Sequence, residues 1–190
     1  TAISPIDGRY RIQIACLDEY FSEYALIEYR VYVEVAYFLF LAKENFFTLP
    51  SKVKKKLLEL VNSFNIEDAL AIKEIEKITN HDVKAVEYFL KNQLKNYDAK
   101  HLVEWVHFGL TSQDINNTAI PLLWKNAIQQ IYIPAITCIE KELQQLAEQW
   151  KNVTILAHTH GQPASPTLLG KELMVFVERI QHQIQLFTQI

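Results

Sequence analysis

The sequence has 190 residues, of which 49% are hydrophobic, and 19 basic against 22 acidic side chains give it a formal net charge of −3. This balance disfavours a nucleic-acid-binding protein, because neutralising many phosphates requires a basic surface. The longest apolar run, residues 35–42, is too short to span a bilayer. We therefore expect a soluble, cytoplasmic protein that binds neither nucleic acid nor a membrane. Only four glycines occur, too dispersed for a dinucleotide fold or a P-loop: Gly8, Gly109, Gly161 and Gly170.

The apolar periodicity is helical almost throughout and predicts an all-α fold. Ser51 and Asp82 have the residue types and positions of helix N-caps. The first predicted helix is rich in aromatic and β-branched residues, but it is unbroken by turn residues and too long for one strand. In chain order, the helices that we expect before Gly109 cover residues 18–45, 51–64, 66–78, 82–94 and 102–108.

A long helix is predicted from Ser112 to Trp150, since apolar residues recur every three or four positions along it. Pro134 should kink this helix without ending it, because the pattern resumes in phase beyond the proline. A loop over residues 152–164 and a last helix beginning at Ser165 and Pro166 should follow. We place a boundary near Gly109, so that residues 1–110 form a small N-terminal helical domain and residues 111–190 begin a long-helix bundle. The helical pattern continues to the last residue, and we expect the sequence to be an N-terminal fragment of a longer α-helical enzyme.

Four polar segments interrupt the helical pattern, each at or just before a predicted helix start: residues 4–10, 79–82, 111–114 and 158–162. Thr111 and Ser112 begin a helix, whose unpaired N–H groups and dipole favour an anion such as a carboxylate. His81 next to Asp82 places an imidazole beside a carboxylate, which can orient the ring for acid–base chemistry near neutral pH. Taken singly, Ser112 and His81 are more typical of a simple N-cap and of a surface histidine at a helix cap.

The histidines of the last segment suit acid–base chemistry better than metal binding. His158 and His160 provide two ligands at most, whereas a metal site needs three or four. His160 is the better candidate for a general acid, because imidazole holds a proton near neutral pH. Arg9 is a candidate for a bidentate phosphate contact. We interpret both cysteines, Cys16 and Cys138, as small core residues without a reactive environment.

Together the four segments resemble the adenylosuccinate lyase family of the fumarase/aspartase superfamily. Residues 159–166, Thr-His-Gly-Gln-Pro-Ala-Ser-Pro, fit the superfamily pattern Thr-His-x-Gln-x-Ala-x-Pro. Residues 111–117 look like its Thr-Ser-x-Asp segment, and residues 4–10 and 79–89 look like the adenylosuccinate branch in particular. The resemblance implies the superfamily's all-α fold, with an N-terminal helical domain followed by its long-helix bundle.

The resemblance also implies a carbon–nitrogen lyase of purine nucleotide biosynthesis. Its reaction is the β-elimination that splits adenylosuccinate into AMP and fumarate, and that cleaves succinylaminoimidazole carboxamide ribotide in the same way. His160 matches the family's general acid, and His81 matches a second histidine that orients substrate or supports proton transfer. No metal ion or organic cofactor is implied, because side chains alone supply the acid and the base.

The remaining site residues are also carried over from the family motifs. Arg9 and Tyr10 match positions that contact the nucleotide phosphate, and Thr111 and Ser112 match the segment that binds the succinyl carboxylates. Asn80, His81, Asp82 and Thr159 match further substrate-binding positions. The family is a homotetramer whose sites combine residues of three subunits, and its catalytic base is a serine in a glycine-containing loop without a counterpart in this sequence. We therefore expect residues 1–190 to be inactive by themselves.

Two alternatives differ in testable ways. Another fumarate-releasing lyase, such as argininosuccinate lyase or a fumarase-like enzyme, usually has a bulky residue at the position of Gly161 and lacks an Asp-Gly-Arg-Tyr opening. A non-catalytic helical scaffold would use the polar segments only as helix caps. In a scaffold, replacing His160 would reduce neither activity nor ligand affinity.

Overall fold

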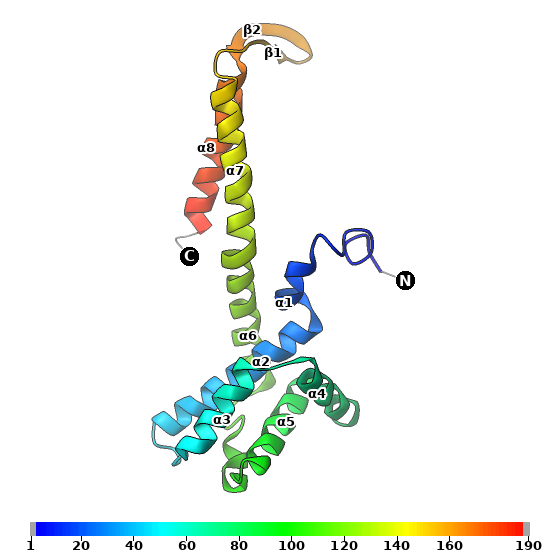
Figure 1. Cartoon of the computed structure of the whole chain (residues 1–190), viewed down its shortest axis with the longest axis vertical. Coiled ribbons are helices and arrows are strands. Elements are labelled where there is room, and N and C mark those ends of the chain that lie inside the picture. The colour runs from blue at the N-terminus through cyan, green and yellow to red at the C-terminus, as the bar shows by residue number, and fades with distance from the viewer. Residues whose placement is uncertain (1–2, 188–190) are drawn as a thin grey trace. The chain divides into compact units, whose positions relative to one another are not determined.

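The computed structural model describes residues 3–187, and it is helical apart from one small β-hairpin (Figure 1). The all-α class expected from the periodicity is confirmed. The chain divides into two compact units, residues 1–127 and residues 128–190, and each is described by itself. The domain boundary expected after residue 110 stays a prediction. No helix among the described residues is long and apolar enough to cross a membrane.

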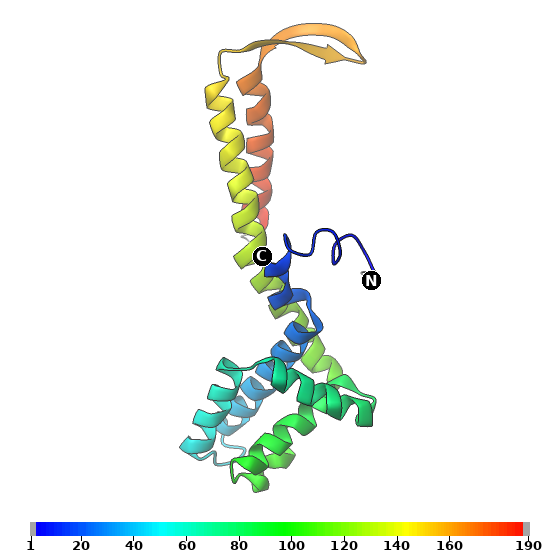
Figure 2. The same ribbon diagram turned by 45° about the vertical axis from the view of Figure 1, so that its right-hand side comes forward.

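The first unit is built around one central helix, α2, which contacts α3, α4, α5 and α6 (Figure 2). A short 3-10 helix, η1, precedes α1, and a second, η2, follows α5. In chain order its elements are η1 (Ala15–Leu17), α1 (Asp18–Phe21), α2 (Glu23–Lys43), α3 (Ser51–Asn62), α4 (Ile66–Thr79), α5 (Asp82–Asn96), η2 (Lys100–Trp105) and α6 (Ser112–Ala127).

An apolar stripe on α2 forms the centre of the core of this unit. Ile27, Val31, Val35 and Phe38 recur every three or four residues, so they share one face of the helix, and all are buried. Burying each such side chain stabilises the fold by about 1.5–3 kcal/mol. They belong to one cluster with buried residues of α3, α4, α5 and η2, among them Leu57, Ile72, Val86, Leu90, Leu94 and Leu102.

Three expectations about helix boundaries and caps in this unit were wrong in detail. The helix expected over residues 18–45 is two helices, because Ser22 is extended (φ −84°, ψ 163°) and its hydroxyl accepts a hydrogen bond from the N–H of Ala25, which begins α2. Ser51 is the first residue of α3 and makes no side-chain cap, since Pro50 occupies the cap position. Asp82 is likewise the first residue of α5, and His81 caps that helix.

The long helix expected from residue 112 to residue 150 consists of α6, a π-helical turn, η3 (Ile128–Tyr132), and α7 (Ile133–Gln149). Pro134 lies in the first turn of α7. A proline inside an α-helix removes a backbone hydrogen bond, and a π-helical turn is one of the recognised ways to accommodate an irregular helix. The chain thus stays helical across Pro134, as the pattern of apolar residues predicts.

In the second unit α7 and α8 (Leu169–Phe187) run side by side and are joined by the hairpin of β1 (Thr154–Thr159) and β2 (Gln162–Leu168) (Figure 1). The expected loop over residues 152–164 and the expected helix start at Ser165 and Pro166 were therefore wrong. The strands are antiparallel, with Thr154 opposite Leu168 and Thr159 opposite Gln162. A two-stranded ribbon tolerates the prolines of β2, because each strand has a free edge. The last residues of the predicted helix, 188–190, lie outside the described part of the chain.

The two cysteines are exposed, so their interpretation as core residues was also wrong. Cys16 lies in η1, which buries none of its residues. Cys138 lies on a part of α7 that is not covered within this chain.

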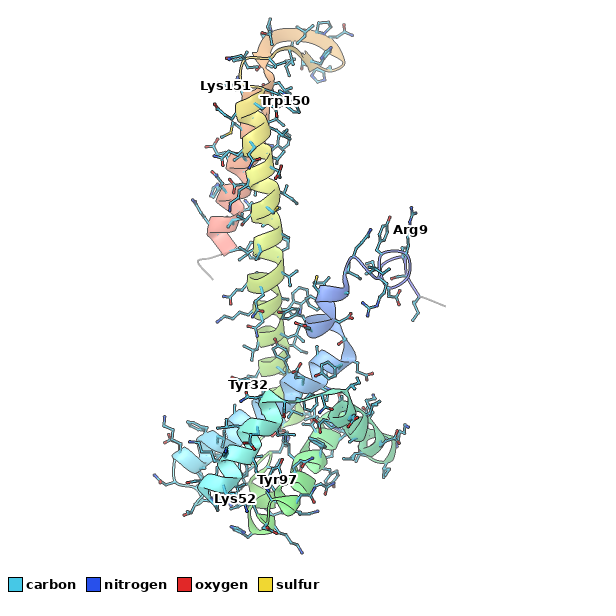
Figure 3. All side chains as sticks on the ribbon, viewed as in Figure 1. Arg9, Tyr32, Lys52, Tyr97, Trp150 and Lys151 are labelled. Carbon is cyan, nitrogen blue, oxygen red and sulfur yellow. The ribbon has the colours of Figure 1, made fainter. Side chains whose placement is uncertain are left out.

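The start of α8 packs unusually closely on the end of α7, where Figure 3 labels Trp150 and Lys151. The N–H of Gly170 donates to the carbonyl of Trp150 at 3.2 Å. A Cβ at Gly170 would lie 2.3 Å from the carbonyl oxygen of Ala147 and 2.7 Å from the Cα of Lys151. Both neighbours are backbone atoms, so a side chain at this position forces the two helices apart.

We predict that Gly170→Ala lowers the free energy of unfolding by about 1–3 kcal/mol, the usual cost of forcing extra volume into a packed contact. Urea unfolding of the variant and of the parent chain measures the difference. Lys171→Ala is the matched control, because Lys171 is exposed on the same turn. Equal unfolding midpoints for Gly170→Ala and the parent would contradict the close packing.

Candidate active site

His81 and Ser112 meet at the point where two of the predicted segments come together. The Nδ1 atom of His81 accepts a hydrogen bond from the N–H of Lys84 at 3.2 Å and so caps α5. Because Nδ1 is the acceptor, the proton of the neutral ring lies on Nε2. Nε2 is 3.3 Å from the hydroxyl oxygen of Ser112 and is therefore the donor in that contact. The imidazole has one defined orientation, and its side chain remains 48% exposed.

Asn80 ends α4 and lies in the turn that connects α4 to α5. Its φ of 50° is in the left-handed region, which asparagine tolerates better than most residues. Its N–H donates to the carbonyl of Glu76 at 2.8 Å, which closes the end of α4. The Thr79 hydroxyl donates to the carbonyl of His81 at 3.1 Å. These local bonds set the position from which the His81 ring extends.

Arg30 of α2 contacts both the start of α5 and α6. Its guanidinium Nη2 is 2.6 Å from the Asp82 carboxylate at the start of α5, and its Nε donates to the Asn116 side chain of α6 at 2.9 Å. Only 7% of Arg30 is exposed. A buried guanidinium needs its hydrogen bonds satisfied and a counter-charge nearby, so Asp82 and Asn116 hold the starts of α5 and α6 at a fixed spacing.

The charge of Arg30 also acts on the titration of Asp82. Partial burial tends to raise the pKa of this carboxyl group. The hydrogen bond from the N–H of Val83 and the positive charge of Arg30 act in the opposite direction and outweigh burial, so the pKa lies below its ordinary value. Asp82 therefore stays ionised as a partner of Arg30 at neutral pH.

Thr111 and Ser112 stand at the start of α6, as predicted, but Thr111 is already engaged. Its N–H and its hydroxyl both donate to the Asp114 carboxylate, at 2.7 and 2.9 Å. The hydrogen bond from the Thr111 N–H is the main cause that lowers the pKa of Asp114. A carboxylate therefore binds at this helix start, and it belongs to the chain itself. Ser112 remains open toward solvent, with His81 beside it.

Arg9 and Tyr10 contact each other and lie apart from this pair. The Arg9 guanidinium carbon is 5.5 Å from the centre of the Tyr10 ring, a cation–π contact. Figure 3 shows Arg9 on the segment that precedes α1. Within residues 3–187 the structure does not bring these two residues into contact with His81 or Ser112.

Thr159 and His160 lie in the second unit, at the tip of the hairpin. Thr159 pairs with Gln162, so His160 and Gly161 form a two-residue turn in which both φ angles are positive, 50° and 76°. This turn geometry favours Asn-Gly and is costly for other residues in the first position. His160 is exposed at the end of the two strands. A histidine held in a left-handed conformation is a local strain of the kind that accumulates at functional sites.

No group of three or more side chains that could bind a metal ion occurs in the described part of the chain. The absence of a metal or cofactor requirement stays a prediction. The residues that do meet supply hydrogen-bond donors, His81 and Ser112, beside a helix start that already holds a carboxylate. Such an arrangement suits the binding of a small anion.

The sequence analysis missed the buried residues that hold the segments of His81 and Ser112 in place. Arg30 and Glu34 of α2 are both buried, and Asn116 lies in a quoted motif to which no role was given. One signal was present. Two opposite charges four residues apart interrupt the apolar and aromatic residues of α2, where an ordinary core helix would continue its apolar pattern.

The sequence matches the family described as Lyase over residues 8–190. The chain belongs to this lyase family. It is 51% identical over its whole length to the adenylosuccinate lyase of Dictyostelium discoideum and 40% identical to that of Escherichia coli strain K12. The chain spans 42% and 43% of the lengths of these two relatives.

Solved structures confirm the fold of this lyase family member. A fumarate lyase from Mesorhizobium sp. BNC1 matches with a TM-score of 0.70 and 23% identity, over 88% of this chain and 38% of the other. The 3-carboxy-cis,cis-muconate lactonizing enzyme from Pseudomonas putida has a TM-score of 0.70 and 18% identity, over 92% of this chain and 39% of the other. At these identities the likeness concerns the fold.

We predict that Asp82→Asn destabilises the first unit, because it removes the counter-charge of a buried guanidinium. The expected loss at pH 7 is about 1 kcal/mol of unfolding free energy, since a half-exposed carboxylate keeps part of its hydration. The folded-state pKa of Asp82 is lowered, so its contribution is present above the ordinary value of 3.8 and is lost as the pH falls through the folded value.

Urea unfolding at a series of acidic pH values tests this linkage. The stability of Asp82→Asn should depend less on pH in that range than the stability of the parent chain. Asp98→Asn is the matched control, because Asp98 is exposed and its φ of 58° suits asparagine equally well. Parallel pH profiles for Asp82→Asn and the parent would rule out the contribution assigned to Asp82.

Proposed function

We propose that this chain provides part of the active site of an adenylosuccinate lyase. The enzyme splits adenylosuccinate into AMP and fumarate, and succinylaminoimidazole carboxamide ribotide into aminoimidazole carboxamide ribotide and fumarate. The observation that carries the proposal is the 51% identity to a curated adenylosuccinate lyase over the whole chain. The paired His81 and Ser112 beside an anion-binding helix start support it.

The reaction is a β-elimination, and it needs an acid and a base. A proton leaves the carbon next to a carboxylate, and the electrons of that bond form the double bond of fumarate while the carbon–nitrogen bond breaks. The nitrogen is a poor leaving group until it is protonated. His160 is the proposed general acid for this protonation. His160 is exposed at the tip of a two-residue turn, where a substrate can reach it.

The segment around Ser112 is the proposed site for the succinyl carboxylates. The Ser112 hydroxyl is free to donate, because it accepts from His81 Nε2. Thr111 would contribute when a substrate carboxylate takes the place of Asp114 on its N–H and hydroxyl. Asn80 and Asp82 would act next to His81, which orients the substrate or supports the proton transfer.

Arg9 and Tyr10 are proposed to contact the nucleotide phosphate. A guanidinium presents several donors to phosphate oxygens in a bidentate geometry, and the neighbouring tyrosine adds a hydroxyl. The exposed position of Arg9 is compatible with such a role (Figure 3). Thr159 is proposed as a substrate contact next to His160.

We further propose that the protein works in the cytoplasm, in purine nucleotide biosynthesis, as a homotetramer with composite active sites. The segments carrying Arg9, Ser112 and His160 would then come from different subunits. Neither a cofactor nor nucleic acid is part of this proposal, because small-molecule acid–base chemistry runs with side chains alone.

The decisive variant is His160→Asn, tested in the native protein that contains this sequence. Asparagine suits the left-handed turn at least as well as histidine, so the hairpin keeps its shape, but the amide holds no transferable proton. We expect the rate of AMP and fumarate formation from adenylosuccinate to fall by about 100-fold or more, the usual scale for a lost general acid. His158→Asn, two residues earlier on β1, is the matched control and should retain activity.

The outcomes separate the alternatives. Turnover that survives His160→Asn would move the acid to another residue, with His81 next to be tested. An unmodified protein that folds and assembles but does not cleave adenylosuccinate would contradict the proposed substrate. Argininosuccinate and malate would then be tested as substrates, and failure with these as well would favour the scaffold.

A further inference from the structure

Three polar side chains of α2 lie beside the apolar stripe of that helix. Arg30, Glu34 and Tyr37 are four and three residues apart, a spacing that places them in one row along the helix. Each reaches a backbone or side-chain group outside α2. All of these partners lie next to the segments that carry His81 and Ser112.

Glu34 binds the residue that opens the turn before α6. Only 1% of Glu34 is exposed, and its Oε1 lies 2.5 Å from Nδ1 of His107. The hydrogen bond with Glu34 raises the pKa of His107 above its ordinary value, which favours the protonated ring beside the carboxylate. The φ of His107 is 61°, so this residue also reverses the chain direction.

Tyr37 holds the next residue of the same turn. Its hydroxyl donates to the carbonyl of Phe108 at 2.9 Å. The N–H of Leu110 donates to the carbonyl of His107 at 3.2 Å, which closes the turn directly before Thr111. The turn over residues 107–110 is thus fixed to α2 by two side chains one helical turn apart.

Arg30 completes the row, because it contacts both segments. Its bonds to Asp82 and Asn116 reach the first residue of α5 and the second turn of α6. Glu34 and Tyr37 therefore fix the approach to α6, while Arg30 fixes α6 against α5. The hydrogen bond between His81 and Ser112 forms where these two helices begin.

Stability alone does not account for these charges. Apolar residues at positions 30 and 34 would fill the same space, and replacing a buried ion pair by well-packed apolar residues is often neutral or stabilising. Desolvation of the polar row lowers the stability of the fold, while its contacts fix the position of residues 107–112. One oxygen of Glu34, Oε2, has no hydrogen-bond partner among the described residues, an added cost of the same kind.

We propose that Glu34 and Tyr37 are positioning residues that set the orientation of Thr111 and Ser112 toward a dicarboxylate, with Arg30 fixing the spacing to His81. The inference rests on the proposed function, in which Thr111 and Ser112 meet the succinyl carboxylates. It extends the site to residues that touch no substrate and that act through the turn over residues 107–110.

The test uses product inhibition of the native protein that contains this sequence. Fumarate reports on the carboxylate-binding segment, and AMP reports on the nucleotide-binding part of the site. The variants are Glu34→Gln, which keeps the shape but loses the charge, and Tyr37→Phe, which loses only the hydroxyl. Glu28→Gln and Tyr32→Phe are the matched controls on α2, at positions outside the polar row.

The expected result is a selective loss. The inhibition constant of fumarate should rise by about three- to tenfold in both variants, the scale of one weakened hydrogen bond. The inhibition constant of AMP should stay within about twofold, less than the effect of one hydrogen bond, because AMP reports on the nucleotide-binding part of the site and not on Thr111 and Ser112. Both control variants should match the parent for both inhibitors. A variant that merely loosens the fold would weaken fumarate and AMP binding alike.

A folded variant without this selective loss counts against the inference. Unchanged fumarate inhibition in the folded variants of an active parent overturns it and leaves the proposed function intact. An equal loss for AMP and fumarate also overturns it, because the role would then be structural. If Glu34→Gln does not fold, Tyr37→Phe decides alone. A parent that binds neither product overturns the proposed function and the inference with it.

Discussion

The buried guanidinium of Arg30 is the contact on which the arrangement of the first unit depends. Through this group α2 binds both the Asp82 carboxylate at the start of α5 and the Asn116 amide of α6. A buried charge tolerates few positions of its partners, because each lost hydrogen bond leaves a desolvated donor. The apolar core beneath it gives α2 its burial, whereas the guanidinium sets where the two helix starts stand relative to each other.

Periodicity predicted most helices of this chain, because amphipathic stripes are local and repeat every three or four residues. It failed where a single side chain decides a boundary. Ser22 begins a new helix by capping it, and nothing in the apolar pattern around it marks a break. The hairpin was missed because Ser165 and Pro166 together are typical of a helix start. The turn between the two strands is seen in the structure, where His160 and Gly161 have positive φ angles.

The candidate site was predicted in part. The segments that carry His81 and Ser112 were recognised because polar motifs interrupt the helices, and the two side chains do meet. The charges within α2 were a signal, but their partners could not be predicted, since Arg30 and Glu34 reach residues more than fifty positions away in the sequence. The local pattern does not say which distant residues such charges will meet. The motifs also do not show that the residues assigned to one site fall in two separate units of the chain.

The cap formed by His81 has a consequence for the kind of chemistry this ring can perform. A histidine that relays protons must hold a proton on both ring nitrogens during part of each catalytic cycle. On His81 the second proton would sit on Nδ1, facing the N–H of Lys84, and the first turn of α5 would lose an acceptor worth about 1 kcal/mol. Every relay event would therefore loosen a helix end. Of the two roles proposed for His81, orienting the substrate as a fixed donor through Nε2 therefore fits this ring better than supporting the proton transfer.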